Sequence, residues 1–488
     1  MSAQTIFVFA VLAPFLHAMF VMSLSRPPGL RDVVHIGFSF VTALLVFLIV
    51  GAVGRGETPG FTVSEPVPGA PLAFAAEPIG VFVAATTAGL GVLAAMHTAG
   101  YARATRDPAP ARLMGGVALC MGLAQAAAFS ANLFTFFLCY QGLVLASFPL
   151  VAHGGGEDGR RAALGHMATL LAASIGLLLP ATIWAQALTD GATFQVGGAL
   201  AGRLDAGSAN VLLAMFVFGL AMTAPPLLHR WLASSIGAPF PSLIVIHALG
   251  LIPAGCVGLL KVTIYVFGAG LREASVAAHA LMIMAGAGMC YAALVSLTRE
   301  DVRERLAYAA MAQSLAVVLG ALLALPAGTF AAALQVAALA CGGATMLMAA
   351  GAAYAVTERG RVEELRGLGR IMPWTMAGFA IGAASVIGMP PFSGAWAKLW
   401  LITASADAGA PWAAGLVGLS AVLLFASLAP LAANALVGPA PVDPFKRSEG
   451  ASLLLVTPIV LGAAATLWLL LAANTAAWFL GPALGGRG

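Results

Sequence analysis

Long apolar stretches without a charged side chain dominate this sequence of 488 residues. Uncharged runs cover residues 113–156, 306–357, 371–397, 408–442 and 451–486. An α-helix needs about 20 apolar residues to cross the hydrocarbon of a bilayer, so each run can hold one or two crossings. Only 9% of the residues are charged, compared with roughly a quarter in soluble domains. The sequence therefore predicts an all-α integral membrane protein.

Loop signals and charge clusters divide the chain into about 14 predicted transmembrane helices. They begin near residues 4, 33, 78, 113, 131, 163, 209, 243, 275, 307, 330, 372, 409 and 451. With this division, 17 Lys and Arg residues fall in odd-numbered loops and 4 in even-numbered loops or at the C-terminus, while Lys261 and Lys398 lie inside spans. The positive-inside rule then predicts that both termini lie on the outer face of the membrane.

Composition and cysteine spacing argue against several classes of function. The net charge of +4 comes without a basic tract interleaved with aromatics, so nucleic acid is not expected as a partner. The five cysteines fall in apolar spans without CxxC or Cys/His spacing, which favours buried thiols over a metal site. No phosphate-binding loop, catalytic triad or cofactor ligand set is visible. We therefore expect no cofactor and no catalytic residue in this chain.

Two Pro-Pro pairs interrupt predicted spans, in TAPPLLHRWL (223–232) and in GMPPFSGAWAKLWL (388–401). Broken helices at matching places in two halves are typical of inverted-repeat transporters. For the first pair, the alternative is that the prolines end a helix at a loop. The second pair is followed by Lys398, and a charge at membrane depth costs about 2.5–3.5 kcal/mol. The interrupted backbone there would offer the ammonium hydrogen-bond partners.

Three segments follow one another with recognisable motifs. They are GAPFPSLIVIHALGLIPAGCVGLLK (237–261), REDVRERLAYAAMAQSLAVV (299–318) and LRGLGRIMPWTMAGFAIGAASVIGMPPFSGAWAKLWL (365–401). In this order they resemble the antiporter-like subunits of respiratory complex I (NADH-quinone oxidoreductase), Mrp cation/proton antiporters and membrane-bound hydrogenases. The resemblance implies 14 helices with two inverted five-helix repeats that contain broken helices. The implied organisation is 1–112 for helices 1–3, 113–265 for the first repeat, 266–438 for the second repeat and 439–488 for helix 14.

In the family that the chain resembles, protons move along buried ionisable residues near the bilayer midplane. Lys398 keeps the terminal lysine position of the second half, and His247 matches a histidine of some members. Other charged positions, in the fifth, seventh, eighth and eleventh spans, fall on uncharged residues here: Gln141, Met222, Pro253 and Gly343. The resemblance therefore implies a proton or ion path through Lys398 and His247.

Three further residues are candidate auxiliary members of this path. Glu77 resembles the acidic residue that opens the family's third span, and we expect it to be a polar anchor. Lys261 closes a span, and we expect its side chain to snorkel to the outer interface. His229 lies beside Arg230 at the end of a span, where a structural role competes with a role in the path.

The resemblance implies a subunit of a multisubunit complex I- or Mrp-related assembly that takes part in proton or monovalent-cation translocation. Its expected partners are other membrane subunits, a soluble catalytic module and the lipid bilayer. The expected location is an energy-conserving membrane such as the bacterial inner membrane. The alternative, suggested by Gln141 and Met222, is a degenerate paralogue that braces or seals such a complex without conducting.

Overall fold

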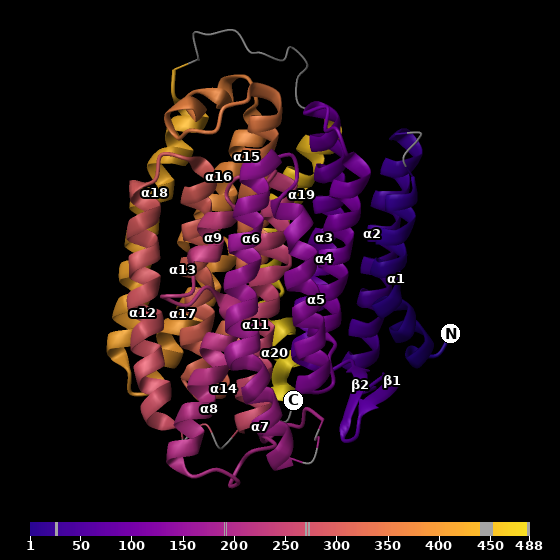
Figure 1. Cartoon of the computed structure of the whole chain (residues 1–488). Helices are drawn as coiled ribbons and strands as arrows, with labels where there is room; N and C mark the ends of the chain where they lie inside the picture. Colours follow the sequence, from indigo (N-terminus) through magenta and orange to yellow (C-terminus); the bar gives the residue numbers. More distant parts are fainter. Residues whose placement is uncertain are drawn as a thin grey trace.

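A computed structural model describes residues 1–24, 28–189, 191, 193–268, 271, 274–439 and 452–485 of this chain. Within these residues, 12 helices are long and apolar enough to cross a membrane, or up to 13 if the bent pair Glu363–Arg370 and Pro373–Ile387 is one span. The long helices run side by side along a common axis (Figure 1). The chain is a multi-pass membrane protein.

The first half of the chain forms helices α1 to α11. They are α1 (Ala3–Ser23), α2 (Pro28–Gly54), α3 (Pro78–Ala104), α4 (Pro110–Ala128), α5 (Leu133–Val151), α6 (Gly156–Ala173), α7 (Leu179–Thr189), α8 (Ala206–Gly219), α9 (Arg230–Ser235), α10 (Phe240–Ile244) and α11 (Leu251–Lys261). π-Helical turns at Ser174–Leu178, Val245–Leu249 and Val262–Phe267 extend or join some of them.

The second half continues with further helices. They are α12 (Ser275–Thr298), α13 (Val302–Leu322), α14 (Pro326–Ala338), α15 (Ala344–Thr357), α16 (Pro373–Ile387), α17 (Ser393–Asp407), α18 (Pro411–Val437), α19 (Leu453–Leu471) and α20 (Ala473–Leu480). A π-helical turn at Leu339–Gly343 joins α14 to α15.

The predicted count of 14 spans is not reached by helices of spanning length in the described ranges. Each predicted start lies within several residues of a helix, but two of the predicted spans are broken. One holds α8, which has 14 residues and ends ahead of the first Pro-Pro pair. The other is divided into α16 and α17, with 15 residues each, by the segment that contains the second pair. The missing length therefore lies at the two proline breaks.

A β-hairpin between α2 and α3 departs from the all-α prediction. Strands β1 (Gly60–Val67) and β2 (Ala70–Ala75) pair antiparallel. Pro68 and Gly69 form the turn, and Gly69 has a φ of 76°, a conformation that glycine adopts without strain. The Pro-Gly pair is a turn signal that the span-based prediction left unused.

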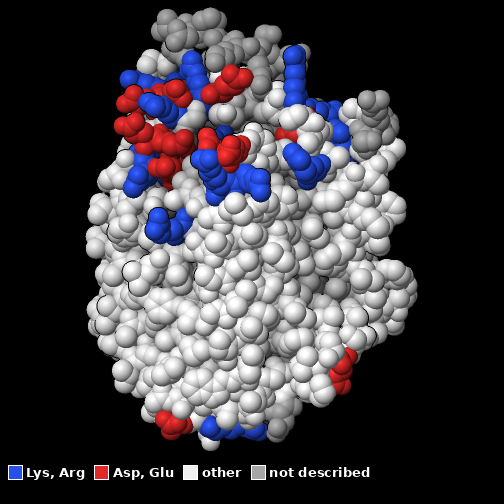
Figure 2. All heavy atoms as spheres, viewed as in Figure 1, with Lys and Arg blue, Asp and Glu red and all other residues white. Residues whose placement is uncertain are grey.

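Charged side chains gather at one end of the visible face, the middle of that face is uncharged, and few charges lie at the opposite end (Figure 2). We call the crowded end the arginine-rich end; it includes Arg103, Arg299 and Arg303. The distribution agrees with the 17-to-4 asymmetry of the loops. Some of the basic residues counted there lie outside the described residues: Arg26, Arg272, Lys446, Arg447 and Arg487.

Two segments with π-helical turns form the centre of the bundle. For both Phe240–Phe267 and Pro326–Thr357, all of the most apolar 18-residue window is buried. Small residues bring their neighbours close: a Cβ added to Gly382 of α16 would lie 2.8 Å from the carbonyl oxygen of Gly342. The centre therefore places α16 directly against the Leu339–Gly343 turn.

Candidate functional site

Lys398 caps the carboxyl end of the broken helix in the second half. It lies on α17, is 5% exposed, and its Nζ donates hydrogen bonds to the carbonyls of Val386 at 2.6 Å and Ile387 at 2.7 Å. The last carbonyls of a helix lack intrahelical partners, and a cation there is favoured by the helix dipole. Gly388 follows with a φ of 95°, and a Cβ on it would lie 2.7 Å from Cδ of Lys398. The hydrogen-bond partners predicted from the proline break are therefore present.

His247 lies fully buried in the π-helical turn Val245–Leu249. Its Nε2 is 3.1 Å from the Ser235 hydroxyl, which itself donates to the carbonyl of Leu232 at 2.7 Å. Because that shorter bond uses the hydroxyl hydrogen, Nε2 of His247 carries the N–H and Nδ1 carries the lone pair. Nδ1 is buried and has no hydrogen-bond partner in the part of the chain that the structure describes. His247 therefore offers a free proton acceptor in the core.

A cavity of about 10 Å³ joins the surroundings of these two residues. His247, Gly343 and Val386 line it together with apolar side chains. Its volume is close to the minimum that holds one water molecule, about 10–15 Å³. Val386 is also the residue whose carbonyl accepts a hydrogen bond from Lys398. The structure thus places His247 in the lining of one small cavity and connects Lys398 to that lining through Val386.

Gly343, the predicted position of the family's eleventh-span lysine, ends the turn Leu339–Gly343 and is buried. A Cβ here would lie 3.2 Å from Cδ1 of Leu339 and 3.6 Å from Cβ of Ala248. A longer side chain at this position would enter the space beside His247. The glycine therefore leaves the cavity open where a lysine is expected from the resemblance.

In the first half, Gln141 and Met222 occupy a neutral, buried region. Gln141 lies on α5, accepts a hydrogen bond from the hydroxyl of Ser174 at 3.2 Å, and leaves its buried Nε2 without a partner. Met222 is fully buried, and its backbone N–H donates to the hydroxyl of Tyr140 at 3.0 Å. The side chains found at these two predicted positions therefore carry no charge.

The backbone that precedes the first Pro-Pro pair is buried and bound by neutral side chains. Thr223 and Ala224 are 0% exposed, whereas Leu227, directly after the pair, is 82% exposed, so the break leads from the core to the surface of the bundle. The indole N–H of Trp231 donates to the carbonyl of Ala221 at 2.9 Å, and the hydroxyl of Ser314 donates to the carbonyl of Thr223. Backbone polar groups freed by the break are thus satisfied inside the protein.

The expectation that Lys261 snorkels to the interface is wrong. Lys261 is 0% exposed, its Nζ lies 3.1 Å from Oε1 of Glu77, and it donates to the carbonyl of Ser130 at 2.7 Å. The hydroxyl of Tyr265 donates to Oε2 of Glu77, and Glu77 also accepts from backbone N–H groups at the start of α3. Glu77 is distant from Lys261 in the sequence, but its carboxylate lies close enough to pair with the ammonium. This pairing offsets the cost of burying the charge of Lys261.

The remaining predicted residues lie away from the cavity lining. His229 is half-buried between the rings of Tyr291 and Tyr308, with ring centroids 5.9 and 6.3 Å away. Pro253 is buried within α11 and contributes no polar side chain.

Sequence reasoning missed a buried pair of amides. Nε2 of Gln335 on α14 donates to Oε1 of Gln313 on α13 at 2.5 Å, and both side chains are at most 2% exposed. α14 packs against α17, the helix that carries Lys398. The sequence does show these two glutamines within predicted apolar spans. They were overlooked because the spans were examined for charged side chains, and an amide carries no charge.

Comparison with known proteins adds a family match and similar folds. A family model described as "NADH:quinone oxidoreductase/Mrp antiporter, TM" matches residues 130–424. An NAD(P)H-quinone oxidoreductase chain 4 of Picosynechococcus sp. is 28% identical over 287 residues, which cover 58% of this chain and 51% of that protein. Subunit L of the NADH-quinone oxidoreductase of Mycobacterium tuberculosis is 24% identical over 331 residues, 66% of this chain and 50% of that protein. The chain thus spans about half the length of these relatives.

Two solved structures share the fold along nearly the whole chain. A chain of the Mrp complex from Dietzia sp. superposes with a TM-score of 0.85 at 22% identity, covering 99% of this chain and 97% of that one. A chain of a membrane-bound sulfane sulfur reductase, an archaeal respiratory membrane complex, gives a TM-score of 0.79 at 20% identity and covers 98% of both chains. At these identities the likeness concerns the fold alone.

Proposed function

Because the chain belongs to the NADH:quinone oxidoreductase/Mrp antiporter transmembrane family, we propose that it is an antiporter-like subunit of a related multisubunit assembly. In this role it takes part in moving protons, or another monovalent cation, across an energy-conserving membrane. The observation that carries the proposal is the cavity lined by both His247 and Val386, with Lys398 bound to the Val386 carbonyl.

The chemistry of this arrangement supports proton transfer. The Lys398 ammonium can release a proton to water in the cavity, because two carbonyls hold it at membrane depth without a carboxylate to keep it charged. His247 can accept a proton on its unpartnered Nδ1 while donating from Nε2 to Ser235. The path therefore uses one cationic and one neutral group on either side of a single water site.

A period of five spans supports the proposed division into repeats. A π-helical turn occurs in the sixth predicted span at Ser174–Leu178 and in the eleventh at Leu339–Gly343. A proline break follows in the seventh span and again in the twelfth. We therefore assign 113–265 and 266–438 as the inverted repeats, with 1–112 and 439–488 outside them.

We also propose an orientation and an assembly for this chain, from the distribution of its charges and from its family membership.

 Positive loops favour the cytoplasmic side, so the arginine-rich end faces the cytoplasm and both termini face outward. In a bacterium this corresponds to the inner membrane. We further propose that the chain associates with other membrane subunits and with a soluble catalytic module. Chains of similar fold occur in the Mrp complex and in the sulfane sulfur reductase complex, which supports assembly into a multisubunit membrane complex.

The substitution Lys398→Met tests the proposal, because it keeps the length of the side chain and removes its charge. We expect ion movement by the assembled complex in sealed membrane vesicles to be lost, while the amount of assembled complex stays nearly unchanged. Glu77→Gln/Lys261→Met is the matched control, since it removes a second buried lysine outside the cavity lining together with the carboxylate that pairs with it, and so leaves no buried charge unpaired.

The outcomes of the Lys398→Met experiment distinguish a role in ion transport from a purely structural role. Normal ion movement in the Lys398→Met complex would refute the transport role of Lys398. Loss of the assembled complex would favour the alternative, in which the chain braces or seals the complex and Lys398 anchors the broken helix.

A further inference from the structure

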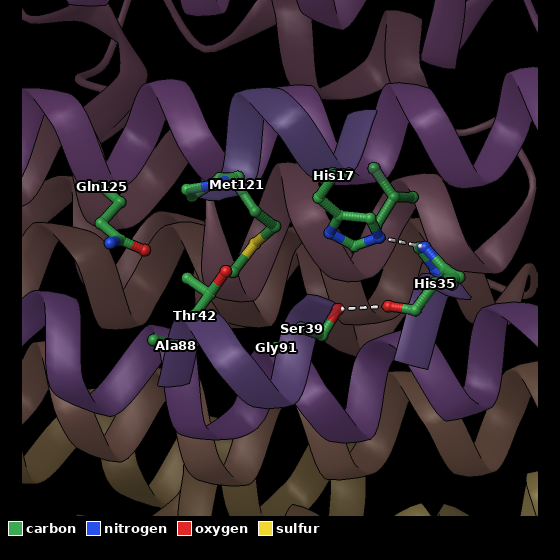
Figure 3. A pocket seen from close by; sticks show the side chains of 11 residues that line it. His17, His35, Ser39, Thr42, Ala88, Gly91, Met121 and Gln125 are labelled. Carbon is green, nitrogen blue, oxygen red and sulfur yellow. Dashed lines mark hydrogen bonds between the residues drawn. The ribbon is translucent and has the colours of Figure 1, made fainter. Parts of the chain in front are cut away.

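A polar cavity lies among the first four helices, where helices 1–3 meet the start of the proposed first repeat. It has a volume of about 30 Å³ and is lined by His17 of α1, by His35, Ser39 and Thr42 of α2, and by Met121 and Gln125 of α4. Figure 3 shows the two histidines at one end of the pocket and Gln125 at the other. The volume is enough for about two water molecules.

The two histidines are joined directly by a hydrogen bond. Nε2 of His17 lies 2.8 Å from Nδ1 of His35, and the side chains are 3% and 0% exposed. Two nitrogens bound to one zinc ion at about 2.0–2.1 Å would stand more than 3 Å apart in tetrahedral geometry, so no metal fits between these two. The pair instead shares a hydrogen, and one ring donates while the other accepts.

Several buried polar atoms along α2 lack hydrogen-bond partners among the residues that the structure describes. They include Nε2 of His35 and Oγ1 of Thr42 at the cavity, and Oδ1 of Asp32, which lies 3.5 Å from Nε of Arg31. Buried polar atoms of this kind are normally satisfied by ordered water, and a polar cavity of this size has room for it. The unpartnered atoms therefore indicate a hydrated site.

These polar residues form a continuous row on one side of α2. Asp32, His35, Ser39 and Thr42 follow one another at intervals of three or four residues, the spacing of one helical face. Ten residues from Asp32 to Thr42 correspond to about 15 Å, or half of the hydrocarbon thickness. The row thus reaches from the end of the helix to the middle of the bilayer.

The row runs from the arginine-rich end to an apolar layer. At the end of the row nearest the arginine-rich end, the half-exposed Arg103 forms an ion pair with Asp32. Beyond Thr42, the next buried large residues of α2 are Val46 and Ile49, both 0% exposed. On α1, beyond His17, the ring of Phe7 packs against those of Phe61 and Phe129, with centroids 5.8 and 5.1 Å away. The polar row therefore lies between the charged end and this apolar layer.

Few other charged groups surround the pair. Arg31 and Asp32 lie on α2 itself, and Arg103 lies on α3. α1 contains no charged residue, and on α4 the only one is Arg112 near its start. α3 also carries His97, which is hydrogen-bonded to the carbonyl of Met348 at 2.9 Å. Asp32 is thus the acid–base group nearest to the pair along α2.

We propose that His17 and His35 form a water-linked proton relay, loaded from the arginine-rich end and separate from the path through Lys398. A proton from water binds the lone pair on Nε2 of His35, and the hydrogen on Nδ1 of His35 passes to Nε2 of His17. The hydrogen on Nδ1 of His17 is then released to water in the cavity. One proton enters and one leaves, and both rings end neutral in the opposite tautomer. The reverse transfer carries one proton back and restores the first tautomers, so the pair exchanges protons between the waters on its two sides.

Hydrogen exchange at the imidazoles tests this relay in the full chain, labelled with ¹⁵N-histidine and held in lipid bilayers. We expect the shared N–H of the pair to be lost in D₂O at least about tenfold faster than the imidazole N–H of His166, which is fully buried and bonded within the core. His17→Gln and His35→Gln identify the signals of the pair. Exchange as slow as that of His166 would overturn the proposal and leave a dry structural pair.

Filling the cavity provides a second test that does not remove either histidine. Gly91 lines the pocket, and a Cβ on it would lie 3.2 Å from Cε of Met121, the flexible end of a side chain. We expect Gly91→Leu to slow exchange of the pair to the rate of His166, and Gly91→Ala to slow it partly. Unchanged exchange in both variants would refute the role of the cavity water, and neither result depends on ion movement through Lys398.

Discussion

Removing Lys261 alone should destabilise the protein much more than removing its charge together with that of Glu77. The ammonium is 0% exposed and lies 3.1 Å from Oε1 of Glu77, whose side chain is 16% exposed. Loss of one partner of a buried ion pair costs about 3–5 kcal/mol, because the other charge stays desolvated. Tyr265 and the N–H groups that open α3 still bind the carboxylate, so we expect Lys261→Met to lie near the lower limit, about 3 kcal/mol.

The double variant Glu77→Gln/Lys261→Met removes both charges and keeps an oxygen that can cap α3. Replacing both partners of a buried pair is often neutral or stabilising, so we expect it to recover most of the loss. The assay is the temperature midpoint of detergent-solubilised protein, followed by size-exclusion chromatography after heating, for the wild type, both single variants and the double variant. A midpoint for Lys261→Met within about 1 °C of the wild type, or a double variant less stable than both single variants, would refute this reasoning.

Three further predictions concern the cavity, pH and assembly. Gly343→Leu should fill the cavity beside His247 and reduce ion movement with little change in the amount of complex, as measured in sealed vesicles. Burial by itself raises the pKa of Asp107. Hydrogen bonds from His153 and from the backbone N–H of Ala109, together with the charges of His153 and Arg112, outweigh burial and lower this pKa below its ordinary value of 3.8. A carboxylate with a lowered pKa stabilises the folded state above pH 3.8, and this stabilisation is lost as the pH falls through the pKa of the folded state. The temperature midpoints of unfolding of the wild type and Asp107→Asn should therefore differ at pH 6 and converge at acid pH. Finally, the chain should copurify with other membrane subunits in mild detergent, and recovery of an active, isolated chain would contradict this.

The sequence could predict features that carry a charge or break a helix. Lys398 was identifiable because an ammonium after two prolines needs backbone partners at membrane depth, and the carbonyls of Val386 and Ile387 fill that need. Lys261 was misplaced because a lysine that closes a span normally reaches the interface. Its burial depends on Glu77, and no local pattern joins residues so far apart in the sequence.

Neutral polar groups were harder to find for a physical reason. His17, His35, Gln313 and Gln335 carry no charge that would interrupt an apolar span, so hydropathy treats their helices as ordinary crossings. Their importance appears only when helices pack and place the polar atoms 2.8 Å apart in the first pair and 2.5 Å apart in the second. Packing also explains the span count, since it is the buried surroundings that allow two proline-broken helices to stay inside the membrane.

The two proline breaks differ in the charge of the side chains that bind them, and this difference bears on function. At the first break, the hydroxyl of Tyr140 accepts a hydrogen bond from the N–H of Met222, and the indole N–H of Trp231 donates to the carbonyl of Ala221; neither side chain carries a charge. Lys398 binds the second break through an ammonium. Loss of a proton from Lys398 would weaken its bonds to the end of α16 and thereby free the carbonyl of Val386, a residue that lines the cavity shared with His247. A change of charge can therefore alter the geometry of the second break, whereas the first break has no such control.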